Sequence, residues 1–370
     1  MKMKKLSESI SGWLTALAAT VLGLSLSVVV IYFLSSVADL VTGGQDEFEF
    51  TDIYARVAQR SPVSALCEDV VIVSVDGCSR ARIAQVIDAV NFFSPSAVGL
   101  DLFFTYPSEE GELLASSIRD CDVMVLPKAV GHSDSESFFY GDFEAEYAAV
   151  NMTSSSVYDV VREYVTLFET DSVEYRSMAY ALAAKAGKDV PAADGQLRNI
   201  WFPSTEFDIV GADELVDSEG FPFMEAGQRI KGKIVLIGVV NDLSDVHRTP
   251  VDDEMPGILI HAHVIDTILN DRHVNEVGTF WNIFIAFVLC LLFIRLFVFM
   301  KNLWDDVGEM VMSVVQLVLM YIFLVLGANL YIRHGIHVDF SLTVVVLGLS
   351  VTALSVINGV KFLLEKYGKK

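Results

Sequence analysis

Two aspartates stand at the ends of short runs of aliphatic residues, where a carboxylate could take part in binding. Asp76 follows the run 70–75, and Asp101 follows the run 97–100. Such runs are typical of buried strands in a parallel sheet, and open α/β sheets bind ligands just outside the carboxyl ends of their strands. Two carboxylates at that edge could hold a metal ion or a cationic ligand. Each could also accept hydrogen bonds from the turn or helix that follows, which requires no ligand.

A second group of polar residues follows a later apolar run that ends in glycine. Asp245, His247 and Arg248 come soon after that run, and His261 and His263 lie at the start of the last helix predicted before the membrane. The two histidines would point to different faces of a helix, and no pair in this group has the i, i+4 spacing of a helical zinc site. We therefore predict no metal site and no cofactor. The candidate ligand-binding residues are Asp76, Asp101, Asp245, His247, Arg248 and His261.

Signatures of catalysis are missing from the sequence. An enzyme needs a nucleophile next to a base, or two carboxylates placed around the bond to be broken. The chain contains no Gly-x-Ser-x-Gly, no phosphate-binding glycine loop and no His-Glu-x-x-His. We therefore expect that the protein is not an enzyme.

The segments that must position the candidate residues alternate between strands and helices. Runs of β-branched residues predict strands at 70–76, 97–104 and 123–126, and apolar residues at helical spacing predict helices at 83–90 and 113–118. Parallel neighbours in a sheet need a crossover connection, usually a helix. This alternation predicts an α/β domain with a mainly parallel sheet.

The second half of this domain is less regular. Between 131 and 170, glycine, serine and aromatic residues interrupt the alternation, which favours antiparallel strands or an insertion. The further elements that we expect are a helix at 173–186, strands at 199–202, 207–210 and 234–238, and a helix at 260–269.

Four apolar segments are long enough to cross a bilayer. The chain is 53% hydrophobic, which is more than is usual for a soluble protein. A spanning helix needs roughly 20 apolar residues, because the hydrocarbon core is about 30 Å thick. The predicted spans are 13–38, 279–300, 311–332 and 340–364. Cleavage of a signal peptide after 36–38 would leave three spans, although such a peptide normally has an apolar core of only about 7 to 15 residues.

Basic residues near the ends of these segments indicate the orientation. Lys2, Lys4 and Lys5 place the N-terminus in the cytoplasm, because cytoplasmic flanks are enriched in Lys and Arg. The segments then expected inside are 1–12, 301–310 and 365–370, and those expected outside are 39–278 and 333–339. Arg295 and Lys361 each lie within a turn or two of a predicted cytoplasmic end, where we expect them to anchor their helices at the headgroups. The sequence thus predicts a multi-pass protein of the cytoplasmic membrane.

The segment expected outside is strongly acidic. Between residues 39 and 278, 16 Lys and Arg stand against 42 Asp and Glu. Such a domain repels nucleic acid and anionic surfaces, and its charge favours cations, basic partners or simply solubility. We therefore expect no nucleic-acid partner.

Three cysteines fall in the external segment, where an oxidising environment permits a disulfide. Cys67 and Cys121 each precede a predicted strand, so in a parallel sheet they would lie at the same edge. Cys78 follows its strand and would lie at the opposite edge, about 20 Å away for a six-residue strand. If a disulfide forms, the expected pair is Cys67 with Cys121.

The order of these segments resembles the extracellular sensory domain called CHASE, type two, which is found in bacterial membrane receptors. The resemblance lies in the segments 71–76, 97–103, 232–238 and 248–262, and together they cover most of residues 60–273. The family's architecture is similar as well, with one N-terminal span, the sensory domain outside, and two or three further spans. One departure follows Asp76, where 77–80 replaces a tryptophan-proline segment expected of many members.

This resemblance implies the reception of a signal. Family members usually continue after the last span into a nucleotide cyclase, a histidine kinase or a serine/threonine kinase, whereas only six residues follow Leu364 in this sequence. We therefore expect a stand-alone sensory module of a bacterial inner membrane that receives an external ligand or partner and relays its state to a separate membrane signalling or envelope protein. A second copy of the chain is a further candidate partner. The alternatives are a scaffold or anchor of an envelope complex and, ranked third, an extracytoplasmic enzyme.

Overall fold

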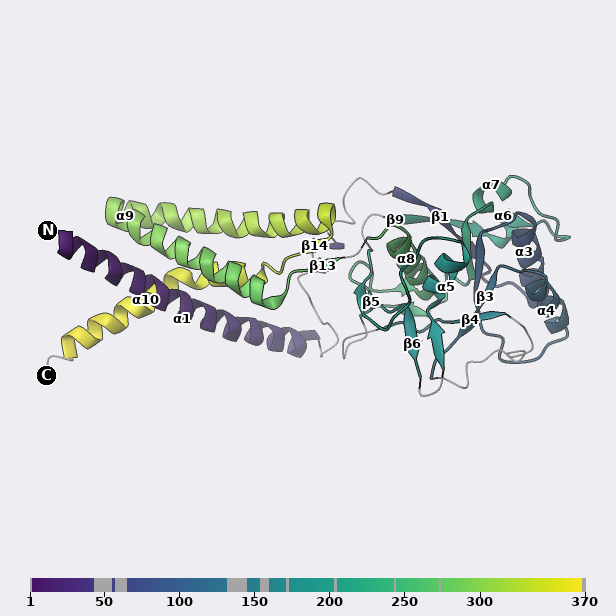
Figure 1. Ribbon diagram of the computed structural model, residues 1–370, viewed down its shortest axis with the longest axis horizontal. Helices are drawn as coiled ribbons and strands as arrows, with labels where there is room; N and C mark the ends of the chain where they lie inside the picture. The colour runs from purple at the N-terminus through teal and green to yellow at the C-terminus, as the bar shows by residue number, and fades with distance from the viewer. Residues whose placement is uncertain are drawn as a thin grey trace. The chain divides into compact units, whose positions relative to one another are not determined.

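The computed structural model describes residues 2–42, 55–56, 65–131, 145–153, 160–170, 173–202, 205–242, 244–272 and 274–367. These residues form two compact units (Figure 1). One unit consists of 1–54 together with 275–370 and is helical, and the other consists of 55–274 and combines a sheet with helices.

A six-stranded sheet forms the centre of the 55–274 unit. Its strand order is β4-β3-β2-β10-β1-β9, and every pairing is parallel. Its strands are β1 (Ala65–Ser74), β2 (Ala97–Asp101), β3 (Met124–Lys128), β4 (Glu146–Ala149), β9 (Thr205–Gly211) and β10 (Ile234–Gly238). The predicted α/β class with a mainly parallel sheet is therefore confirmed. The sequence pattern did not predict that β10 lies between β1 and β2.

Helices cover both faces of this sheet, as Figure 1 shows. On β1, Val71 and Val73 face one core while Val70 and Ile72 face the other. The first core includes α3 (Arg80–Phe92), α4 (Gly111–Arg119), α6 (Ala212–Leu215) and α7 (Gly227–Ile230), and the second includes α5 (Met178–Lys185) and α8 (Gly257–Leu269). Burial on both faces explains why the strands are continuously apolar rather than alternating.

Short antiparallel ladders accompany the parallel sheet, and two of them include residues of the 131–170 segment, where we expected antiparallel strands or an insertion. The pairs are β5 (Glu163–Tyr164) with β8 (Arg198–Asn199), β6 (Leu167–Glu169) with β7 (Glu174–Arg176), and β11 (Val246–His247) with β12 (Met255–Pro256). The helix predicted at 173–186 begins later, at Met178. It does so because Ser177 is extended and its hydroxyl accepts a hydrogen bond from the backbone N–H of Tyr180, which caps the helix.

Three helices among the described residues are long and apolar enough to cross a membrane. They are the stretch Ser11–Phe33 of α1 (Lys2–Thr42), α9 (Thr279–His334) and α10 (Ser341–Tyr367). We predicted four such segments, and the structure places the second and third in the single element α9.

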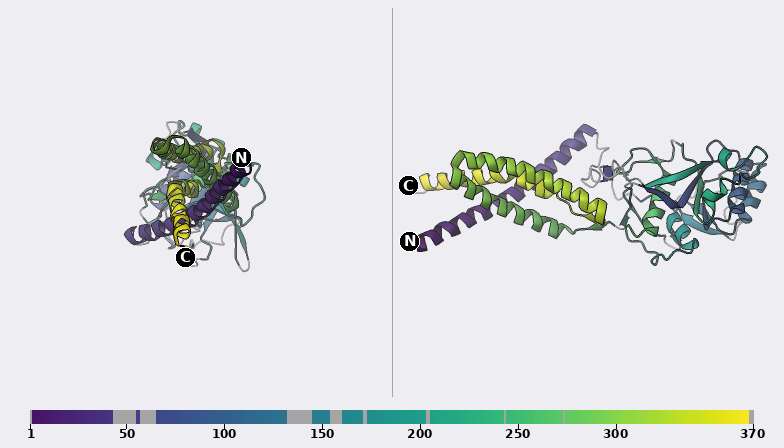
Figure 2. Two further views of the ribbon diagram at one scale, coloured as in Figure 1. Left: turned by 90° about the vertical axis from the view of Figure 1, so that its left-hand side faces the viewer. Right: turned by 90° about the horizontal axis from the view of Figure 1, so that it is seen from above.

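The element α9 is a hairpin rather than a rod. Its backbone is non-helical at Asp305, where φ is 49° and ψ is −126°. Its two ends lie together, because β13 (Asn275–Glu276), just before it, pairs with β14 (Ile336–His337), just after it. The right-hand view in Figure 2 shows the helix doubling back. At the turn, Gly308 approaches Met300 so closely that a Cβ atom there would overlap the Met300 carbonyl.

The structure does not pair Cys67 with Cys121, the pair that we expected if a disulfide forms. All four cysteines of the chain are described, and all are free thiols. Cys67 packs in the core with α5 and α8, whereas Cys121 packs in the core with α3 and α4, on the opposite face of the sheet. The sequence argument placed both residues at one edge of the sheet, but it did not determine which face each side chain would take.

Candidate functional site

Asp76 holds the end of β1 to the loop that follows β10. One carboxylate oxygen accepts hydrogen bonds from the backbone N–H groups of Val240 and Asn241 at 3.0 and 3.1 Å, and the other accepts from Asn241 Nδ2 at 2.9 Å and from the Ser74 hydroxyl. Burial alone would raise the pKa of Asp76, but these hydrogen bonds lower it below its ordinary value. The carboxylate therefore joins two segments of the fold, which is the role that requires no ligand.

Asp101 lies at the carboxyl end of β2, within electrostatic reach of several other predicted site residues. Its burial raises the pKa of the carboxyl group, the charges of His261 and His247 act in the opposite direction, and Asp245 raises it further. The structure thus brings Asp101, Asp245, His247 and His261 together at this edge of the sheet.

Asp245 and His247 form the more accessible part of this group. His247 Nε2 lies 3.2 Å from Asp245 Oδ1, and 54% of the Asp245 side chain is exposed. The Asp245 carboxylate also lies against Gly257 in the first turn of α8, and its backbone carbonyl accepts a hydrogen bond from the Gly257 N–H at 3.0 Å. This pair therefore borders the start of α8.

The backbone of Arg248 connects two segments of the fold. It forms a parallel bridge with Val160, and its carbonyl accepts a hydrogen bond from the Val161 N–H at 2.8 Å. This contact fixes the segment that leads into β5. Asp76 and Arg248 are thus the two predicted site residues that the structure explains by connections within the fold.

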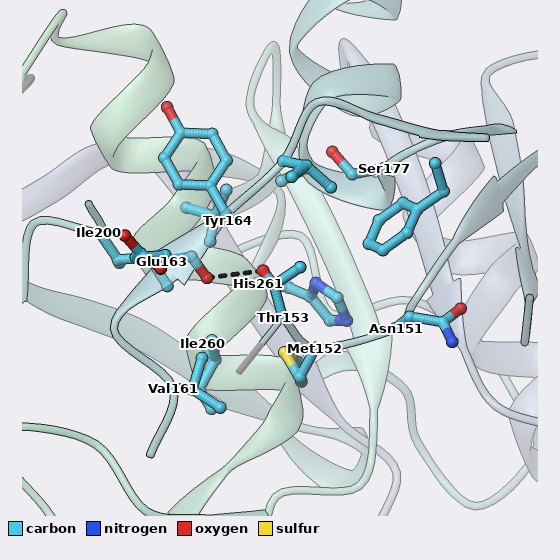
Figure 3. A pocket seen from close by; sticks show the side chains of 14 residues that line it. Asn151, Met152, Thr153, Val161, Glu163, Tyr164, Ser177, Ile200, Ile260 and His261 are labelled. Carbon is cyan, nitrogen blue, oxygen red and sulfur yellow. Dashed lines mark hydrogen bonds between the residues drawn. The ribbon is translucent and has the colours of Figure 1, made fainter. Parts of the chain in front are cut away.

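A cavity opens beside His261, between α8, α5 and the antiparallel segments (Figure 3). Its volume is about 20 Å³, enough for roughly one water molecule or a group of similar size. Most of its wall is apolar. The lining residues are Asn151, Met152, Thr153, Val161, Glu163, Tyr164, Val165, Phe168, Ser177, Ala179, Ile200, Ile260, His261 and Val264.

Several polar side chains of the cavity are already occupied by the fold. The amide of Asn151 exchanges hydrogen bonds with the backbone of Val130, at 2.7 Å to its oxygen and 2.9 Å from its nitrogen. The Thr153 hydroxyl donates to the Glu163 carbonyl at 2.7 Å, the bond drawn in Figure 3. Ser177 caps α5. These bonds hold the wall of the cavity in place.

Two polar side chains of the cavity keep hydrogen-bonding capacity. Glu163 Oε2 is buried without a partner among the described residues, and the other side chain is that of His261. Only 5% of the residue is exposed, and its ring lies near the centre of the view in Figure 3. Within the described part of the chain, no hydrogen bond is made to its ring. An imidazole in this situation can donate to or accept from a bound molecule.

The sequence identified only one lining residue of this cavity, His261. The others come from the irregular segments between 150 and 200 and from buried faces of α5 and α8, where no motif marks them. Among the described residues, no three His, Cys, Asp or Glu side chains are placed to hold a metal ion. The arrangement therefore presents a buried imidazole and a buried carboxylate oxygen at a small, largely apolar cavity.

Comparison with known proteins gives one match. The family model of the CHASE2 domain matches residues 24–297, about three quarters of the chain. No curated protein and no solved structure matches it.

Proposed function

The chain belongs to the CHASE2 family of extracellular sensory domains, and from this premise we propose that the cavity beside His261 receives a small-molecule signal. One observation carries the proposal. Ile260, His261 and Val264 of α8 all line the cavity, and α8 is the last helix before the membrane helix α9 in the sequence. A molecule in the cavity would therefore contact the helix that leads directly to the membrane segment.

The relay proceeds through α8. Eleven of its thirteen residues are buried, so the helix cannot shift without disturbing both the cavity wall and the core against the sheet. A ligand changes such an equilibrium only by binding one position of the helix more tightly than another. We propose that the bound and empty cavities favour different positions of α8, and that a membrane partner responds to the resulting change in the helices that follow.

We also propose that the chain crosses the membrane four times, with 39–278 outside. The hairpin in α9 supports this topology, because each of its halves, 279–304 and 306–334, exceeds the roughly 20 residues that a span needs. Lysines at both chain ends and at the turn fit the positive-inside rule.

A cysteine in place of the exposed Glu219 should react with a membrane-impermeant reagent in intact cells, and one in place of Lys366 should not. The reverse pattern would refute the orientation.

We propose binding rather than catalysis at the cavity. The Thr153 hydroxyl is occupied by the Glu163 carbonyl, and the Ser177 hydroxyl accepts a hydrogen bond at the start of α5. Both hydroxyls thus make their hydrogen bonds to the backbone rather than to a base that could activate them.

The experiment is a thermal-shift screen of small molecules on the full chain in nanodiscs. A ligand that binds only the folded state must raise the melting temperature, by an amount that grows with its concentration. Met152→Trp narrows the cavity at a partly exposed position, and Val173→Trp adds the same bulk at an exposed position that does not line it. We expect compounds that stabilise the parent and the Val173 variant but not the Met152 variant. Compounds that stabilise all three equally would place binding elsewhere, and a screen without any stabilising compound would favour the scaffold alternative.

A further inference from the structure

An arginine of α9 lies directly on the first apolar turns of α1. The guanidinium group of Arg295 stands 4.5 Å from the centre of the Trp13 ring. A Cβ atom built on Gly12 would lie only 2.6 Å from an Arg295 nitrogen, so the absence of a side chain at Gly12 is what lets the guanidinium reach the backbone of α1. This contact places the arginine between two helices rather than free at the bundle surface.

A lysine of α10 reaches the same part of α1. The ammonium group of Lys361 donates a hydrogen bond to the hydroxyl of Thr15. Positions 12 and 15 are three residues apart, so they lie on one face of α1 within about one turn of each other. Arg295 and Lys361 therefore bring two positive charges to one short stretch of α1 from two other helices.

These two charges have no anionic partner among the side chains that the structure describes in the helical unit, 11–33 and 275–367. Lys301, by comparison, forms an ion pair with Glu309 at 2.6 Å, whereas neither Arg295 nor Lys361 lies within ion-pair distance of a described carboxylate. Glu365 is one turn beyond Lys361 on α10 and does not pair with it. A cation among apolar helices is costly unless something neutralises it.

We propose that Arg295 and Lys361 bind the phosphate headgroup of an anionic phospholipid beside residues 12–15 of α1. A guanidinium can donate two parallel hydrogen bonds to a phosphate, and an ammonium adds a third donor. Basic pockets between membrane helices are suited to such headgroups. The half-exposed Trp13 provides the aromatic surface that sits well at the level of the headgroups. Figure 1 shows both chain ends and the turn of α9 at the same end of the helical unit, where a headgroup layer would lie.

The test uses the full chain in detergent, loaded with a mixture of phosphatidylglycerol and phosphatidylcholine and then washed, with the retained lipid measured by mass spectrometry. We expect the protein to retain phosphatidylglycerol selectively. The double variant Arg295→Gln/Lys361→Gln should bind it about 30-fold more weakly, which corresponds to about 2 kcal/mol for the loss of two basic side chains. Lys366→Gln removes a cation of the same helix end that lies over Phe362 and Tyr367, and it should retain the lipid.

Two further arms distinguish a lipid site from damage to the helical bundle and from a site for free phosphate. Arg295→Lys/Lys361→Arg keeps both charges and should keep most of the retention, which a damaged bundle would not allow. In phosphatidylcholine nanodiscs, inorganic phosphate should not reproduce the thermal stabilisation given by phosphatidylglycerol. Equal retention by the neutral double variant, an equal loss in Lys366→Gln, a complete loss in the charge-preserving variant, or an equal effect of inorganic phosphate would each overturn the assignment.

Discussion

The stability of the 55–274 unit should depend on pH through one buried histidine, His263. The ring packs against Phe202 and Phe207, with centroid separations of 5.2 and 4.9 Å, and its Nδ1 is buried without a hydrogen-bond partner among the described residues. Burial lowers the pKa of His263 to about 4, and a hydrogen bond with the Trp201 backbone offsets only part of this effect. Protonation would place a charge between two aromatic rings.

The size of the effect follows from that shift. The pKa of His263 is about 6.5 in the unfolded chain and about 4 in the folded protein, so folding favours the neutral ring. The resulting contribution to stability is complete above pH 6.5 and is lost as the pH falls. Linkage gives a loss of about 2 kcal/mol at pH 5 and about 3 kcal/mol near pH 4.

Trp201 offers a probe for this prediction, because it is the one tryptophan in the sequence between residues 55 and 274, and its backbone N–H donates a hydrogen bond to the Thr267 hydroxyl of α8 at 2.9 Å. We would replace the other three tryptophans by phenylalanine and follow urea unfolding of the full chain in nanodiscs by Trp201 fluorescence. His263→Phe removes the titrating group and should make the decline between pH 7 and pH 5 shallower by about 2 kcal/mol. Phe202→Leu should lower stability about equally at both pH values. A parallel decline in the parent and in His263→Phe would refute the reasoning.

Three further outcomes are expected. Asp76→Asn replaces an acceptor of four hydrogen bonds by an amide and should lower the free energy of unfolding by about 1–3 kcal/mol in the same urea assay. Gly308→Ala should lower the melting temperature, because its methyl group would overlap the Met300 carbonyl, whereas Gly359→Ala, with no neighbouring atom within 4 Å, should not. Under denaturing, non-reducing conditions, all four cysteines should react with iodoacetamide; fewer than four modified thiols would indicate a disulfide.

The sequence was sufficient for the class of the fold because the central strands are unusually apolar. The segments around Val71, Val98 and Val235 are buried on both faces of the sheet, and burial on both faces produces continuous aliphatic runs. The position of β10 between β1 and β2 depends on tertiary packing, which no local pattern records. The hairpin in α9 was foreseen as two spans, because the polar residues of 301–310 interrupt the apolar pattern.

The site was harder to predict. The ends of the strands indicate the edge of the sheet at which ligands tend to bind, but they do not indicate on which face of the sheet the cavity lies. Asp76 and Asp101 have the same place in the sequence pattern, yet Asp76 is held by a loop while Asp101 lies near His261. The cavity is lined by Thr153 and Glu163 from irregular segments, whose approach depends on short antiparallel pairings. Patterns of periodicity carry no information about such pairings.

The helix α8 carries polar residues that contact the cavity, the aromatic core and an arginine. A helix buried on nearly all sides would normally be apolar, yet α8 places His261 at the cavity, His263 between two aromatic rings and Asp266 within 3.3 Å of Arg272. Each polar group fits its surroundings in one position of the helix, so a shift of α8 would break several interactions at once. The proposed relay from the cavity to α9 would require such discrete positions rather than a continuous range.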